Sequence, residues 1–166
     1  MPSSRADIVR RAQRRRTCTQ PDEQSPVKCV LDADVALKWF FADRADEPLV
    51  APAIALLQRF QTGEDRFLCP PHFIAEMAAV LARESPETAN DSVNDLLTMT
   101  WETMADEVVY RRAIALANTL DHHLFDTLYH AVALVHGAKL VTADAKYFKK
   151  AKTLGAVVWL ADVAIY

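Results

Sequence analysis

The sequence is poor in glycine, has few cysteines and contains no long apolar run. With 3 glycines in 166 residues, it has neither of the glycine-rich loops that hold nucleotide phosphates, and an all-β fold with many tight turns is disfavoured. The 3 cysteines, Cys18, Cys29 and Cys69, are odd in number and too widely spaced for a zinc site, so we expect reduced thiols. No run approaches the ~18 apolar residues of a membrane span, and the basic N-terminus lacks the apolar core of a secretory signal. These absences together predict a cytoplasmic protein.

Positive charge is concentrated at the N-terminus. Residues 1–28 hold 7 of the 19 basic and 3 of the 22 acidic residues, so the remainder of the chain is clearly acidic. Residues 1–27 contain little apolar surface to offset their ordering entropy, and we expect this leader to be disordered or loosely docked. An RNA-binding arm is the alternative role for the leader. We assign residues 28–166 to a single domain.

From residue 28 onward, strand-like and helix-like segments alternate. Short apolar runs predict strands over 28–31, 66–69, 139–142 and 156–160, with a possible further strand at 100–103. Apolar residues at helical spacing predict helices over 33–41, 48–61, 71–82, 90–99, 106–120, 125–136 and 147–152. This alternation predicts an α/β fold, a three-layer α/β/α sandwich with a central parallel sheet.

Four acidic residues are expected to meet at one edge of that sheet. Asp32 and Asp144 each follow a predicted strand, Asp126 opens a helix, and Glu76 lies on an otherwise apolar helix face. Ligands of open α/β sheets bind beyond the carboxyl ends of the strands, where such residues converge. Taken singly, each aspartate has a structural alternative as a helix or turn cap, and Glu76 as the partner of a buried arginine. Four acids from four separate elements favour a common site.

The chemistry of such a cluster is limited by charge. Two carboxylates ~5 Å apart repel by about 3 kcal/mol at an effective dielectric near 20, so the cluster must hold protons or bind a cation. Oxygen ligands alone favour Mg²⁺ or Mn²⁺, as one or two ions, and such sites suit phosphodiester hydrolysis.

Several segments resemble one known family. They are Val30-Leu31-Asp32-Ala33, the segment 71–81 with Glu76, His123-Leu124-Phe125-Asp126-Thr127-Leu128-Tyr129 and Leu140-Val141-Thr142-Ala143-Asp144. In order and spacing they resemble the PIN-domain family over about 135 residues, with the leader outside the match. The resemblance implies a metal-dependent ribonuclease that binds Mg²⁺ or Mn²⁺ through Asp32, Glu76, Asp126 and Asp144.

The resemblance also implies a biological setting. Many small members of this family are VapC-like toxins of type II toxin–antitoxin systems. They cleave RNA, often tRNA or ribosomal RNA, form homodimers and are inhibited by a VapB-like antitoxin. The expected partners of this chain are therefore RNA, a second copy of itself and such an antitoxin.

Two positions depart from the family pattern. Asp34 stands where a small hydroxyl residue is common two positions after the first acid, and it either adds charge near the metal or caps a helix. Ala79 stands where an asparagine commonly follows the glutamate by three, so Glu76 is expected to be less tightly oriented.

Other residues are assigned smaller roles. The Thr142 hydroxyl is expected to orient an acid or a water, and Lys146, Lys149 and Lys150 either contact RNA phosphates or form a solvated face. We interpret three histidines as loop or surface residues, namely His122, His123 and His130. Three tryptophans are expected in core or dimer packing, namely Trp39, Trp101 and Trp159.

Two rival interpretations remain at this point. A degenerate PIN-like domain would serve as a scaffold or RNA-binding module without catalysis. A haloacid dehalogenase-type phosphatase would use Asp32-Ala33-Asp34 as its DxD motif, but Ala36 and the absence of a later acidic pair disfavour it.

Overall fold

The computed structural model of the protein describes residues 26–165, and its described part contains five strands, all parallel, and seven α-helices. The predicted leader lies outside the described residues except at its last two positions. The sheet has the order β3-β2-β1-β4-β5. The strands are β1 (Val27–Leu31), β2 (Asp65–Cys69), β3 (Glu102–Thr103), β4 (Lys139–Thr142) and β5 (Val157–Trp159). The helices are α2 (Ala33–Phe40), α3 (Val50–Thr62), α4 (Phe73–Glu84), α5 (Ala89–Thr98), α6 (Glu107–Leu120), α7 (Leu124–His136) and α8 (Ala145–Ala151).

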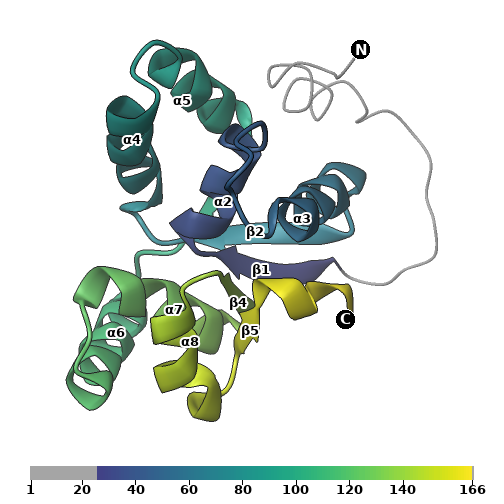
Figure 1. The fold of residues 1–166 in the computed structure, drawn as a ribbon. Helices are drawn as coiled ribbons and strands as arrows, with labels where there is room; N and C mark the ends of the chain where they lie inside the picture. Colours follow the sequence, from purple (N-terminus) through teal and green to yellow (C-terminus); the bar gives the residue numbers. More distant parts are fainter. Residues whose placement is uncertain (1–25, 166) are drawn as a thin grey trace.

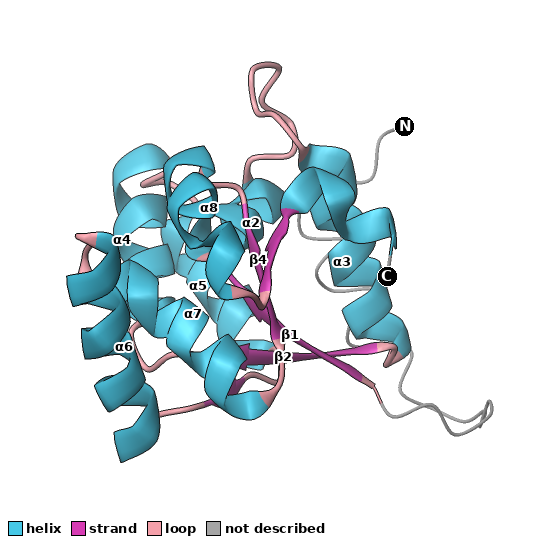
Figure 2. Cartoon of the chain, turned by 90° about the horizontal axis from the view of Figure 1, so that it is seen from below, coloured by secondary structure: helices cyan, strands magenta, loops and turns pink. Residues whose placement is uncertain are grey.

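Helices cover both faces of the sheet. Helices α2 and α3 lie on one side, and α7 packs against β1, β2 and β4 from the other, with α6 outside it (Figure 1). In Figure 2 the strands pass between α7 and α3. Helices α4 and α5 pack on each other, and α4 also packs on α2. The predicted three-layer parallel architecture is therefore confirmed.

The chain ends in two short 3-10 helices, η1 (Lys152–Leu154) and η2 (Leu160–Ile165). The second of these packs on α3, so it completes the layer on that face of the sheet. In the described part of the chain, no helix combines the length and the apolar character needed to cross a bilayer.

The start of α4 differs from its predicted position. The helix was expected to begin at Pro71, but Pro71 and His72 lie in a turn before the helix, which begins at Phe73. The Phe73 amide donates to the Pro70 carbonyl at 3.2 Å. This bond closes a turn over residues 70–73, so the helix begins only at the end of that turn.

An aromatic cluster fills the core between the sheet and the α2, α3 and α4 layer. Its stacked or tilted rings are those of Trp39, Phe60, Phe67, Phe73 and Trp101. The indole nitrogen of Trp39 donates to the Ala53 carbonyl at 2.8 Å, and that of Trp101 donates to the Leu96 carbonyl at 2.8 Å. These bonds satisfy the indole groups on burial. Core packing of Trp39 and Trp101 is thus observed as expected.

His130 corrects one expectation from the sequence. It was interpreted as a loop or surface histidine, but it lies within α7 and is fully buried. Its Nδ1 is 3.0 Å from the Tyr147 hydroxyl, and its Nε2 is 2.8 Å from the Gly155 carbonyl. Because a buried imidazole needs partners, these contacts tie α7 to α8 and to the turn before β5.

An ion pair between a partly exposed arginine and a buried aspartate closes the connection between α3 and β2. Arg59 donates from Nε and Nη2 to the two carboxylate oxygens of Asp65 at 2.9 and 2.8 Å. The Asp65 side chain is fully buried, whereas Arg66 on the same strand is exposed and pairs with the partly exposed Glu102 of β3.

We expect Arg59→Met to destabilise the protein by about 3–5 kcal/mol, because it leaves the buried Asp65 carboxylate without its partner. The matched variant Arg66→Met removes an exposed arginine and should cost no more than about 1 kcal/mol. Urea unfolding followed by circular dichroism measures both. Equal losses in the two variants would contradict the structural role of the pair formed by Arg59 and Asp65.

Candidate active site

Four helix N-termini meet at the carboxyl edge of the sheet. Helices α2, α4 and α8 each follow one of the three adjacent strands β1, β2 and β4, so each begins where its strand ends. Helix α7 leads into β4 and must run antiparallel to it, which places its N-terminus at the same edge. A parallel sheet therefore gathers the positive ends of four helix dipoles in one place.

Each of these N-termini carries an acid. Asp34, Glu76 and Asp126 lie in the first turns of α2, α4 and α7, while Asp32 and Asp144 are the N-cap residues of α2 and α8. Carboxylates are favoured at these positions because the helix dipole is positive there. The four predicted site acids thus lie on elements that converge, together with Asp34.

Capping explains only one of these acids. The Asp32 side chain makes no capping hydrogen bond to α2, and Asp126 is not the N-cap of α7, a position held by His123. Asp144 does cap its helix, since its Oδ1 accepts from the amides of Lys146 at 2.7 Å and Tyr147 at 3.0 Å. Both bonds use Oδ1, so Oδ2 lies outside the cap.

Thr142 connects two of the acids. Its buried hydroxyl donates to Asp32 Oδ2 at 2.7 Å and accepts from the Asp144 amide at 3.0 Å. One hydroxyl can play both parts, since it has one proton and two lone pairs. The end of β4 thereby holds Asp32 and Asp144 in a defined relation.

The acids influence one another electrostatically. Burial raises the pKa of Asp32 to about 7, and the neighbouring charge of Asp34 adds to this, followed by those of Glu76 and Asp126, while the Thr142 hydrogen bond acts in the opposite sense. Burial likewise raises the pKa values of Asp34 and Glu76. The site therefore holds more negative charge than its surroundings stabilise.

Glu76 has a partner that the sequence did not suggest. The Tyr129 hydroxyl donates to Glu76 Oε2 at 2.6 Å, and His72 Nε2 lies 3.6 Å from the same oxygen. Tyr129 is buried in α7, so Glu76 is oriented across two elements. Ala79, at the position where the family often has asparagine, is exposed. Orientation of Glu76 is thus supplied by tyrosine instead.

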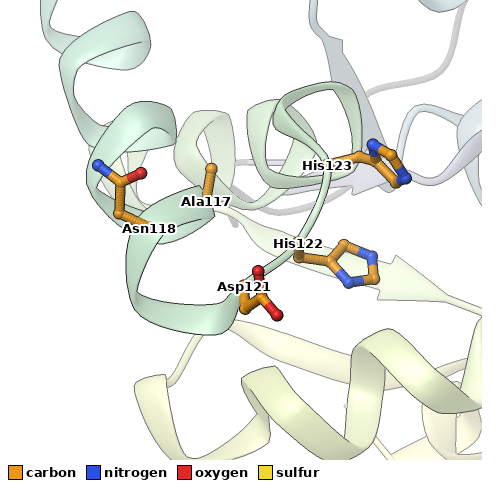
Figure 3. Close-up of a pocket in the computed structure, with 5 residues that line it drawn as sticks. All are labelled: Ala117, Asn118, Asp121, His122 and His123. Carbon is orange, nitrogen blue, oxygen red and sulfur yellow. The ribbon is translucent and has the colours of Figure 1, made fainter.

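Asp126 lies beside a histidine from the loop between α6 and α7. His122 Nε2 is 3.0 Å from Asp126 Oδ2, and the His122 side chain is only 15% exposed. His122 and His123 project to the same side of this loop, away from Asn118 (Figure 3). They line a hollow of about 620 Å³ together with Ala117, Asn118 and Asp121.

The lysines that follow Asp144 are exposed, and one has a structural role. Lys150 Nζ donates to the carbonyls of Leu120 at 3.0 Å and Asp121 at 2.9 Å, and so caps the C-terminus of α6. Contacts of Lys146, Lys149 and Lys150 with RNA stay predictions.

A buried lysine lies close to the acids. Lys38 is 6% exposed, and its Nζ is 2.5 Å from Glu47 Oε1. Burial raises the pKa of Asp34, and the positive charge of Lys38 is the main effect that acts against this rise. Lys38 therefore offsets part of the negative charge on the α2 side of the site.

Sequence reasoning missed three residues of this environment: Lys38, His72 and Tyr129. Helical spacing offered a signal for one of them, because His72 precedes Glu76 by four residues. His122 was interpreted as a loop or surface histidine, and it does lie in a loop, 3.0 Å from Asp126. No such signal identified Lys38 as buried.

Among residues 26–165, no group of three or more histidine, cysteine, aspartate or glutamate side chains is arranged closely enough to enclose a metal ion. The acids are electrostatic neighbours, not a completed coordination sphere.

The parallel sheet and the acidic edge define an α/β domain with a carboxylate-rich site at the ends of its strands. A match to the PIN domain family covers residues 29–154, and the chain belongs to this family. Members of the family are typically metal-dependent nucleases. Membership sets aside the phosphatase interpretation. No curated protein matches the chain.

The raised pKa of Asp32 has a consequence for stability in the absence of divalent ions. An unfolded aspartate has a pKa near 3.9, so between about pH 4 and pH 7 the folded state binds the extra proton, and stability falls as pH rises through this window. We expect Asp32→Asn to raise stability at about pH 8 by roughly 1–3 kcal/mol and to flatten the pH dependence. Thermal unfolding in EDTA at several pH values measures this.

Glu87→Gln is the matched control, because Glu87 is an exposed acid in the turn before α5. It should leave the pH dependence unchanged. A wild-type protein whose melting temperature rises steadily over the same window would contradict the assignment of Asp32 as a destabilising charge.

Proposed function

We propose that the protein is a cytoplasmic, metal-dependent endoribonuclease that hydrolyses RNA phosphodiester bonds at a site formed by Asp32, Glu76, Asp126 and Asp144. The observation that carries this proposal is the environment of Asp32. Burial and three neighbouring acids disfavour its charged form, and a divalent cation is the partner that such an arrangement lacks.

The donors fit Mg²⁺ or Mn²⁺, as one or two ions, because they are carboxylate oxygens with no cysteine among them. When bound, such an ion supplies activation of a water and neutralisation of charge on the phosphate. Asp32, Asp126 and Asp144 would hold it directly. The second oxygen of Asp144, which lies outside the α8 cap, is suited to this.

Three side chains would position these groups. Thr142 orients Asp32 and the backbone of Asp144, and Tyr129 orients Glu76 through the bond to Oε2. Glu76 retains Oε1 for a further ligand contact or for use as a base through water. Because the hydroxyls of Thr142 and Tyr129 are neutral, they order the acids without reducing the charge that binds the cation.

The proposal includes a biological role as the toxin of a toxin–antitoxin pair. Under it, the protein forms a homodimer, cleaves tRNA or ribosomal RNA, and is inhibited by a VapB-like antitoxin. Family membership and the domain size support this part. The competing proposal, a degenerate RNA-binding or scaffold domain, is favoured only by Ala79, and the bond from Tyr129 to Glu76 weakens that argument.

Purified protein incubated with an RNA pool and Mg²⁺ should cut the RNA, and Asp32→Asn should slow cutting by at least about a hundredfold. Asp162→Asn, at an exposed acid in η2, should cut like the wild type. Gel electrophoresis of the products measures the rates. In cells, expression should arrest growth and Asp32→Asn should relieve the arrest. Equal cutting by wild type and Asp32→Asn would point to a contaminating nuclease or another site.

Mn²⁺ should raise the melting temperature by about 5–10 °C at ~100 times its dissociation constant, since it binds only the folded site. Asp144→Asn should remove most of this increment. Asp106→Asn is the matched control, because Asp106 also caps a helix, α6, through a bond to the Val109 amide. It should lower the starting melting temperature yet keep the Mn²⁺ increment.

Two outcomes separate the alternatives. An absent Mn²⁺ increment that Asp144→Asn leaves unchanged would remove the metal site from the proposal. A normal increment without RNA cleavage would instead favour the degenerate, RNA-binding domain.

A further inference from the structure

A small hollow lies beside the acids, between α4 and the first turn of α7. It has a volume of about 270 Å³ and is lined by His72, Ala75, Glu76 and Phe125. Its wall is largely apolar apart from the Glu76 carboxylate. The volume of the hollow is slightly below that of typical pockets for drug-sized ligands, so the hollow suits one small planar group.

Phe125 is unusual among the apolar residues of the site. Its side chain is 61% exposed, although it precedes Asp126 directly and the neighbouring helix faces are well packed. Two other large apolar residues in the described chain are about as exposed, Leu97 on α5 and Val108 on α6, and both lie outside the hollow and are aliphatic. Core packing does not account for an aromatic ring in this position.

The ring of Phe125 is supported from one side. Its centroid is 5.0 Å from that of His72, and the His72 ring in turn meets Tyr129 edge-on at 5.0 Å. Tyr129 donates a hydrogen bond to Glu76. The residues that support Phe125 are therefore in contact with one of the proposed metal-binding acids. The ring is therefore backed by a buried network while its surface stays accessible to a ligand.

The charge around this hollow selects its occupant. No lysine or arginine is among the described residues that line the hollow, so a phosphate finds no cationic partner there, whereas the uncharged face of a nucleobase needs none. Aromatic rings that bind single-stranded RNA stack on unpaired bases, and a paired base within a helix has no free face to offer.

We propose that this hollow binds one unpaired base of the RNA substrate, with Phe125 as the stacking surface, next to the nucleotide whose phosphate lies at the acids. The inference rests on the proposed ribonuclease function and deepens it. It adds a base-binding residue, Phe125, to the site that the acids form. The hollow would recognise a base by stacking, so it would accept different bases.

Photocrosslinking tests this placement in the full-length Asp32→Asn variant, which is expected to bind RNA without cutting it. The probe is a short oligoribonucleotide of 5-iodouridine, which on irradiation couples to an aromatic ring stacked on the base. Mass spectrometry should locate the crosslink at Phe125. A fully paired RNA duplex of the same length should give no crosslink there.

Binding of a fluorescent single-stranded RNA to variants in the same background tests the energetic role. Phe125→Ala should weaken binding about 5- to 150-fold, as expected for loss of one stacked base, and Phe125→Trp should restore it. The control Leu97→Ala removes an equally exposed apolar side chain and should leave affinity unchanged. In the active protein, Phe125→Ala should act mainly by raising KM.

The failures of the two proposals are distinguishable. If the wild type cuts RNA but Phe125→Ala binds and cuts equally well, or the crosslink maps elsewhere, the base subsite is overturned while the ribonuclease stands. If Phe125→Ala changes only the oligomeric state in sedimentation, the hollow is a protein contact and the base subsite is likewise overturned. If the wild type neither binds nor cuts RNA, both proposals fail.

Discussion

The mutual direction of the strands is the constraint on which the rest of this structure depends. Because β1, β2 and β4 are adjacent and parallel, the helices that follow them begin at one edge, and α7, which returns to β4, begins there too. Five carboxylates lie on these four N-termini. The helix dipoles favour each one individually, yet the acids disfavour one another when they are brought together.

The protein holds this unfavourable arrangement with neutral groups. Thr142 and Tyr129 give hydrogen bonds to Asp32 and Glu76, and neither adds a positive charge that would compete with a cation. Lys38 offsets part of the charge at Asp34, and it is itself paired with Glu47. Under the proposed function, a site built in this way would be ordered before a metal ion binds and would gain electrostatic stability from it.

Phe125 and Asp126 show how one helix turn can serve two purposes. Asp126 lies on the side of α7 that faces the other acids, whereas Phe125 lies beside the hollow next to α4. The buried Tyr129 makes two contacts: its ring meets the ring of His72, which supports Phe125, and its hydroxyl donates to the carboxylate of Glu76. A base held at Phe125 and a phosphate held at the acids would thus share one rigid frame.

The sequence by itself determined the parallel architecture, and it identified Asp32, Glu76, Asp126 and Asp144 as candidates, because alternating strand and helix patterns and acids at strand ends are local signals. The sequence also pointed to the Thr142 hydroxyl as a group that orients an acid, but only the tertiary structure decided that this acid is Asp32 and that Tyr129 orients Glu76. Thr142 and Asp32 are 110 residues apart, Tyr129 and Glu76 are 53 apart, and His130 proved buried instead of exposed. Local patterns carry no record of such pairs, since burial and hydrogen bonding between distant segments arise only when the layers pack.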